Sequence, residues 1–135
     1  MRTVLLTALI ALAIAPTQSA LAKGSPTPPQ LKAARISDTD YPKEALKAGL
    51  EGDVLASFIV DLKGRVTECK YQTAEGAELL GDQSCSLLVE RFRYTPARDA
   101  ERKVVAAEMQ QPFYWRIGGK CPANLAPNAI CITRP

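Results

Sequence analysis

The chain contains no histidine among its 135 residues. Histidine is the side chain that most often serves as a general base near neutral pH, and it is a common ligand of zinc. The serines stand singly, without a nucleophile-elbow pattern, and no glycine-rich phosphate loop opens a helix. These absences argue against the common forms of catalysis and predict a protein that is not an enzyme and has no cofactor.

Strong charge of one sign is also missing. The net charge is only +3, and no cluster of lysine and arginine stands out. Because a nucleic-acid surface needs a basic patch, we expect no nucleic-acid partner, and nothing in the sequence indicates a small-molecule substrate. The candidate carboxylates fall in turns or at polar positions, where solvated or capping roles are expected: Asp61, Glu68, Asp82 and Asp99.

No hydrophobic run is long enough to predict a membrane-spanning helix. The run Val4 to Ala15 has about twelve residues, whereas a spanning helix needs roughly twenty. It follows Arg2 and precedes the small-x-small sequence Ala20-Leu21-Ala22, which predicts a signal peptide over 1–22 that is cleaved after Ala22. The alternative is that the same segment is retained as a membrane anchor. Residues 23–38 include Ser25 to Gln30 (SPTPPQ) and predict a flexible linker.

The cysteines number four, at positions 69, 85, 121 and 131. An even number in an exported domain predicts two disulfides, and a zinc site is disfavoured because no C-x-x-C pair is present. Cys69 lies on one face of a predicted strand whose neighbouring residues on the opposite face are polar, and Cys85 lies on the apolar face of a predicted helix. We therefore expect Cys69 to pair with Cys85, and Cys121 with Cys131.

The remaining sequence predicts five elements in the order helix, strand, strand, helix, strand. Asp40 is the expected N-cap of the first helix, with Pro42 in its first turn and Gly49 at its end. Pro112 interrupts the last strand, so that strand should lie at a sheet edge or be bulged there. We expect an α+β fold with two helices on a three-stranded antiparallel sheet. The expected elements are Tyr41 to Ala48, Asp53 to Val60, Arg65 to Thr73 after a turn at Leu62 to Gly64, Ala77 to Arg93, and Lys103 to Ile117.

Four short motifs follow one another along this part of the chain. They are Tyr41-Pro42, Gly52-Asp53-Val54, Asp61-Leu62-Lys63-Gly64-Arg65-Val66 and Phe92-Arg93-Tyr94-Thr95-Pro96-Ala97. In this order they resemble the C-terminal domain of the TonB family of energy transducers, from about Asp40 to Ile117. The chain then divides into a signal peptide (1–22), a linker (23–38), a TonB C-terminal-like domain (39–117) and a disulfide-closed tail (118–135).

The resemblance implies a periplasmic protein-binding module in transport. In that family the domain binds outer-membrane transporters and accepts an extended peptide, the TonB box, as an added strand. A second copy of the chain is a further candidate partner. Whichever amide of Ala107 and Gln111 faces outward is expected to donate to the peptide, and Trp115 is expected in the core. The implied partner-binding residues are Val104, Val105, Ala107, Met109, Gln111, Tyr114 and Tyr41.

The chain also differs from family members that transmit energy. Those members keep a membrane helix with a coupling histidine and a long proline-rich spacer, whereas this sequence has no histidine and only a short proline-containing linker. A second interpretation therefore stays open. The chain could be a structural or inhibitory envelope protein that keeps the fold and has lost peptide binding, with its tail covering the edge.

Overall fold

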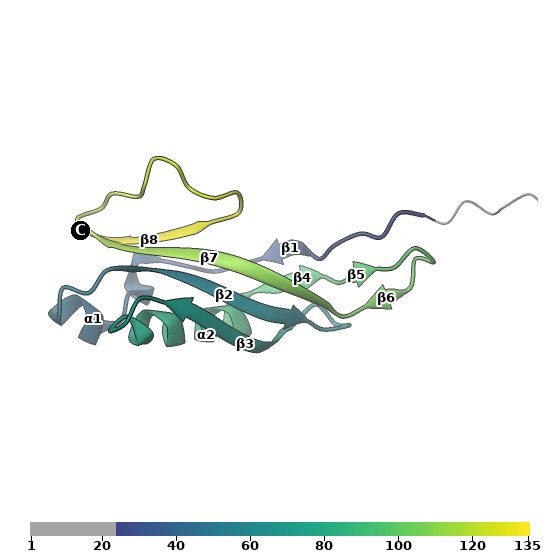
Figure 1. Cartoon of the computed structure of the whole chain (residues 1–135), viewed down its shortest axis with the longest axis horizontal. Coiled ribbons are helices and arrows are strands. Elements are labelled where there is room, and N and C mark those ends of the chain that lie inside the picture. Colours follow the sequence, from purple (N-terminus) through teal and green to yellow (C-terminus); the bar gives the residue numbers. More distant parts are fainter. Residues whose placement is uncertain (1–23) are drawn as a thin grey trace, which may run out of the picture.

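The computed structural model describes residues 24–135 and contains one main sheet with helices on one side (Figure 1). The expected signal peptide at 1–22 lies outside the described residues. No helix in the described part is long and apolar enough to cross a membrane. The elements are β1 (Gln30–Ala33), the 3-10 helix η1 (Asp38–Asp40), α1 (Lys43–Lys47), β2 (Gly52–Val60), β3 (Val66–Thr73), α2 (Glu78–Arg91), β4 (Arg93–Thr95), β5 (Ala97–Arg98), β6 (Val104–Val105), β7 (Ala107–Ile117) and β8 (Ile130–Arg134).

The main sheet has four strands in the order β3-β2-β7-β8. β2 is antiparallel to both β3 and β7, whereas β8 runs parallel to β7. The expected three-stranded antiparallel sheet is therefore wrong in strand count, although the α+β class and the two helices are as expected. Two short pairs, β1 with β4 and β5 with β6, complete the strands of the described chain.

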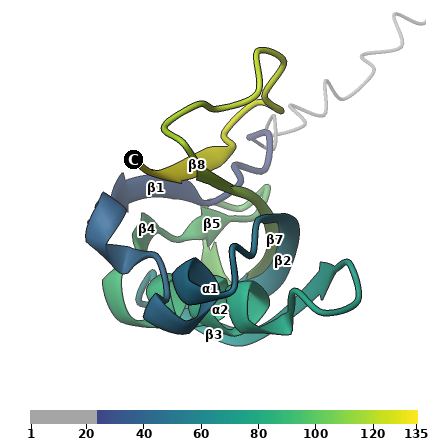
Figure 2. The same ribbon diagram turned by 90° about the vertical axis from the view of Figure 1, so that its left-hand side faces the viewer.

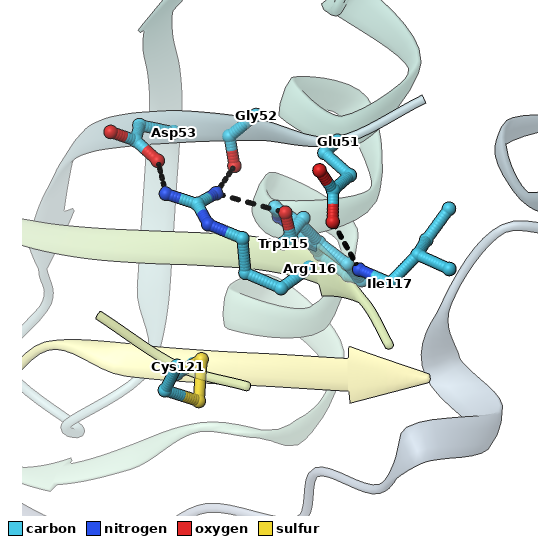
Figure 3. The surroundings of a disulfide bond; sticks show 8 residues. Glu51, Gly52, Asp53, Trp115, Arg116, Ile117 and Cys121 are labelled. Carbon is cyan, nitrogen blue, oxygen red and sulfur yellow. Dashed lines mark hydrogen bonds and ion pairs between the residues drawn. A yellow bond between two sulfur atoms is a disulfide. The ribbon is translucent and has the colours of Figure 1, made fainter. Parts of the chain in front are cut away.

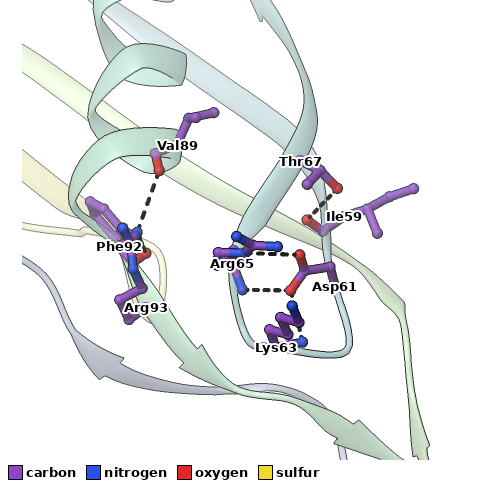
Figure 4. Close-up of polar contacts among 8 residues, drawn as sticks. All are labelled: Ile59, Asp61, Lys63, Arg65, Thr67, Val89, Phe92 and Arg93. Atoms are coloured by element: carbon purple, nitrogen blue, oxygen red, sulfur yellow. Dashed lines mark hydrogen bonds and ion pairs between the residues drawn. The ribbon is translucent and has the colours of Figure 1, made fainter.

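The β2–β3 hairpin follows directly from its turn sequence. The carboxylate of Asp61 accepts hydrogen bonds from the main-chain N–H groups of Lys63 and Arg65, each at 2.9 Å (Figure 4). These bonds lower the pKa of Asp61, and the bond from the Arg65 N–H has the largest effect. Gly64 takes a positive φ of 77°, and its carbonyl accepts the N–H of Tyr94 at 2.8 Å. The turn thus sets the register of the hairpin and also ties it to β4.

The core lies between the sheet and the helices, which Figure 2 shows on the inner side of the curved sheet. Trp115 is fully buried, and its indole N–H donates to the hydroxyl of Ser84 on α2 at 3.0 Å. The ring of Tyr41 meets the Trp115 ring edge-on, with 5.2 Å between centroids. The expectation that Trp115 belongs to the core is confirmed. The largest other fully buried side chains are Phe92, Phe113, Leu80, Leu87 and Leu88.

Both expected disulfides are present. Cys69 of β3 is bonded to Cys85 of α2, and Cys121 is bonded to Cys131 of β8. The first bridge fixes the long helix against the hairpin. The second closes the segment between β7 and β8.

The start of the first helix differs from the sequence prediction. The helix spans only Lys43–Lys47 with Pro42 as its N-cap, so Asp40 does not cap it. The Asp40 carboxylate instead accepts the N–H of Ser37 at 2.8 Å and pairs with Arg91 on α2 at 2.6 Å. Asp40 is 7% exposed, so this contact anchors η1 to the long helix.

Two other segments also differ from the expected ones. The expected linker at 23–38 contains the strand β1, which pairs with β4 through Leu31 and Tyr94. The expected strand at 103–117 is divided into β6 and β7, because Val104 and Val105 pair with β5 instead of the main sheet. The β1–β4 pairing is not visible from local periodicity, because the two strands lie some sixty residues apart. β5 and β6 are close in the sequence, but each has only two residues, too few to show an alternation.

Candidate functional site

The candidate site is the side of β7 that faces away from β2. β2 pairs with β7 along Ala107 to Trp115, whereas β8 pairs only with Phe113 to Ile117. Along 107–112, no strand of the described chain pairs with β7 on its second side. The tail therefore covers one half of this edge and leaves the other half open.

Pro112 shows which main-chain groups point to the open side. It faces Leu55 in a ladder that runs through this position without a register shift. Since proline has no N–H to donate, its nitrogen must face away from β2, and the alternation of an antiparallel pair then turns every even-numbered residue the same way. Two bonds agree: the N–H of Gly118 donates to Arg134 of β8 at 2.7 Å, and the N–H of Ile117 donates to Glu51 on the β2 side at 2.5 Å.

Glu108 and Gln110 therefore carry the main-chain donors and acceptors of the open half. Both side chains are exposed. By the same alternation the amides of Ala107 and Gln111 face β2, so the expectation that one of them faces outward is wrong. An added strand could form hydrogen bonds with Glu108 and Gln110 without disturbing the existing ladder.

A hollow of about 410 Å³ lies on the sheet face beside this open half. Its walls combine apolar and charged groups from three adjacent strands. Alternate side chains of an added strand point to the two faces of the sheet, so one set would project toward this hollow. It is lined by Ser57, Phe58, Ile59, Glu68, Lys70, Glu108, Met109 and Gln110.

The other expected site residues on β6 and β7 have different surroundings. Val104 and Val105 are half-buried in the β5–β6 pair, whereas Ala107 and Met109 are half-buried on the open half of β7. Gln111 is only 4% exposed, and its amide donates to the carbonyl of Asn128, just before β8, at 2.5 Å. Gln111 thus connects the strand with the tail.

Tyr114 belongs to the half of β7 that β8 covers. Its ring lies beneath the guanidinium group of Arg116, 5.6 Å from the ring centroid. Arg116 also reaches across to β2, where it pairs with Asp53 at 2.5 Å and donates to the carbonyl of Gly52 at 3.2 Å (Figure 3). These contacts hold β2 and β7 together beside the Cys121–Cys131 bridge.

Tyr41 lies in the core, apart from the open edge. It is 2% exposed, and its hydroxyl donates to the carbonyl of Leu50 at 2.7 Å. Burial, with the nearby Glu51 carboxylate, raises the pKa of Tyr41, and Arg116 partly opposes this rise. The structure therefore does not bring Tyr41 together with the β7 residues at an exposed surface.

Sequence reasoning missed Glu108, Gln110 and the whole of β8. The position of Pro112 contained the signal for Glu108 and Gln110. A proline in a strand has its nitrogen facing outward, so the amides two and four residues away face outward as well. The alternation Ile130-Cys131-Ile132-Thr133 is typical of a half-buried strand. Ile132 is indeed 2% exposed in the core.

Comparison with known families identifies a matching domain. The model for the Gram-negative bacterial TonB protein C-terminal matches residues 37–117. The match includes η1, both helices and strands β2 to β7, and it ends before β8 begins. No curated protein matches the chain.

Proposed function

Because the chain belongs to the TonB C-terminal family, we propose that it is a periplasmic protein-binding module that pairs with an extended segment of an outer-membrane transporter or another envelope partner. The family is associated with TonB-dependent transport, and its domains bind proteins in the Gram-negative envelope. The proposed contact is main-chain pairing along the open half of β7. Such pairing needs an extended partner and little side-chain complementarity.

The open main chain of Glu108 and Gln110 is the observation that carries the proposal. Two residues that face outward offer two N–H donors and two carbonyl acceptors to an added strand. Both positions are exposed, and no strand of residues 24–135 pairs with them on this side. The adjacent hollow gives room for a side chain of the partner.

One observation favours the second interpretation, a structural or inhibitory envelope protein. β8 pairs with Phe113 to Ile117, so that part of β7 already has a neighbour. The open half alone gives a partner fewer hydrogen bonds than the full strand would. We therefore expect weak binding at the open half and none at the covered half while β8 is in place.

A proline substitution tests the pairing directly. Gln110→Pro removes one outward N–H and leaves the ladder with β2 unchanged, and the preceding Met109 already has the extended conformation that proline favours. In an NMR titration with a synthetic TonB-box peptide, we expect the wild-type amide shifts to centre on 107–111. The variant should bind about tenfold more weakly, because one main-chain hydrogen bond contributes about 1 kcal/mol and the ring adds a steric obstacle.

The matched control is Gln110→Ala, which keeps the N–H and shortens the side chain. It should bind nearly as well as the wild type, since the contact is made by the main chain. Equal binding by Gln110→Pro and the wild type, or loss of binding with Gln110→Ala, would contradict pairing at this edge. An absence of shifts at millimolar peptide would support the structural or inhibitory protein.

A further inference from the structure

β8 occupies the covered half of the β7 edge as a strand supplied by the chain itself. We propose that β8 is a displaceable strand, and that the Cys121–Cys131 disulfide controls its displacement from Phe113 to Ile117. The link between this displacement and partner binding rests on the proposed function, because release of β8 would add Phe113 to Ile117 to the open half of β7. The displacement itself is a property of this chain and can be measured without a partner.

The attachment of β8 is limited. It pairs with β7 over five residue pairs, and no strand of the described chain pairs with its other side. Its one fully buried side chain is that of Ile132, while Ile130 is half-buried against the core. The ion pair between Arg134 and Asp38, at 3.3 Å, joins two exposed side chains and contributes little. Elements held by so few contacts open locally before the rest of a domain.

The route of the chain explains why the disulfide matters. The segment 118–129 arches away from β7 and returns into β8, as Figure 1 shows. With the bridge closed, a detached β8 stays joined to β7 through residues 118–121 and the Cys121–Cys131 bond. With the bridge open, the connection is the whole of 118–129. A tether about three times longer lowers the effective concentration of β8 at β7 about fivefold.

The entropy of closing the whole loop between Cys121 and Cys131 sets the upper limit for this lowering of the effective concentration, at about a hundredfold.

The bridge is also accessible to a reductant, because Cys121 is exposed and Cys131 is half-buried. A dithiol reductant opens it in two exchanges: one thiolate attacks a bridge sulfur, forms a mixed disulfide with that cysteine and releases its partner cysteine, and the second thiol then attacks the mixed disulfide and releases the first cysteine. Two electrons and two protons pass to Cys121 and Cys131, which become thiols, while the reductant becomes a disulfide.

The second disulfide provides a matched control. Cys69–Cys85 joins β3 to α2, at the opposite edge of the sheet from β8. Its removal destabilises the domain without lengthening the tether of β8. A double variant at each bridge therefore separates displacement of β8 from general loss of stability.

Hydrogen exchange of the full chain tests the proposal. In Cys121→Ser/Cys131→Ser, the amides that face β8, those of Tyr114, Arg116 and Gly118, should exchange about tenfold to a hundredfold faster than in the wild type. The amides of Phe113 and Trp115, which face β2, should keep their rates. Dithiothreitol added to Cys69→Ser/Cys85→Ser should give the same selective increase, since only the Cys121–Cys131 bridge remains to be reduced.

Equal rates at the three β8-facing amides with the bridge open and closed would overturn the proposal. An equal acceleration of the amides that face β8 and of those that face β2 would overturn it as well. Peptide binding is decided separately, by titrating Cys121→Ser/Cys131→Ser with the TonB-box peptide. Selective exchange without any peptide shift would support the displaceable strand and contradict the proposed function, whereas peptide shifts without selective exchange would do the reverse.

Discussion

Gly64 illustrates how one residue of the hairpin turn is fixed by two requirements. Its φ is 77°, and a Cβ at this position would lie 1.9 Å from the carbonyl oxygen of Tyr94. The first requirement favours glycine in any turn of this kind. The second comes from the hydrogen bond that draws β4 onto the turn.

Gly64→Ala should therefore lower the free energy of unfolding by roughly 3 kcal/mol, which combines left-handed strain with a backbone clash. Chemical denaturation measures this loss. Gly76→Ala is the control, because Gly76 has a φ of 86° but no atom beyond its chain neighbours lies within 4 Å of the added methyl group. The control should lose only about 1 kcal/mol. Similar losses for the two variants would show that the contact with Tyr94 has no energetic role.

Tyr94 makes stability depend on pH in the alkaline range. Burial raises the pKa of Tyr94 to about 12, from about 10 for an exposed tyrosine. The stability linked to the protonated phenol is fully present below about pH 10 and is lost as the pH rises toward 12.

Tyr94→Phe removes the phenol, so the wild type should lose about 1 to 2 kcal/mol relative to this variant between pH 10 and 12. Urea unfolding of both proteins across that range measures the difference. Tyr41 and Tyr71, whose pKa values are also raised, are present in both proteins and cancel. Parallel pH curves would contradict the assignment to Tyr94.

At the scale of elements, the Cys69–Cys85 bridge connects β3 to α2 over a sequence separation of 16. Replacing both cysteines with alanine should lower the free energy of unfolding by roughly 3 kcal/mol, because the unfolded chain gains conformational freedom. Denaturant titration of the variant against the wild type checks this value. A loss below about 1 kcal/mol would mean that the helix–hairpin packing alone holds these elements.

Elements defined by local signals were predictable. The hairpin follows from the turn residues Asp61 and Gly64. The long helix follows from its apolar periodicity, and the Cys69–Cys85 pair follows because Cys85 lies on the apolar face of that helix and Cys69 on one face of the strand. β8 was not predicted, since a parallel strand is specified by pairing across a long connection and not by a turn. β1 was missed because β4, the strand with which it pairs, lies some sixty residues away.

The site was predictable to a similar extent. The sequence identified β7 as the edge to examine, but it gave the wrong outward amides. Ala107 and Gln111 have odd numbers, whereas the outward nitrogen of Pro112 shows that the even-numbered residues face outward. Tyr41 was assigned by its place in a motif. Its burial depends on Trp115, which approaches it only through the fold.

For the whole molecule, the N-terminal pattern predicts export. N-terminal sequencing of protein recovered from a periplasmic extract should begin at Lys23, because Ala20-Leu21-Ala22 has the small residues that signal peptidase requires. Fractionation of the inner membrane is the matched control. Recovery there alone, with Met1 intact, would contradict cleavage and favour a retained anchor.

The contact between Trp115 and Ser84 has a spectroscopic consequence. Trp115 is the only tryptophan of the chain, so the fluorescence excited at the red edge of the absorption band comes from a single indole. That indole is shielded from water on the helix side of the sheet and donates to Ser84 at 3.0 Å. Its emission should be blue-shifted in the native protein and should move to longer wavelength when α2 separates from β7. Ile132 of β8 pairs with Trp115 in the ladder and belongs to the same buried core, so release of β8 alone should remove one apolar neighbour of the indole and shift the emission less than separation of α2 does. The size of the shift thus gives the native chain an optical probe that distinguishes opening of its last strand from loss of its core.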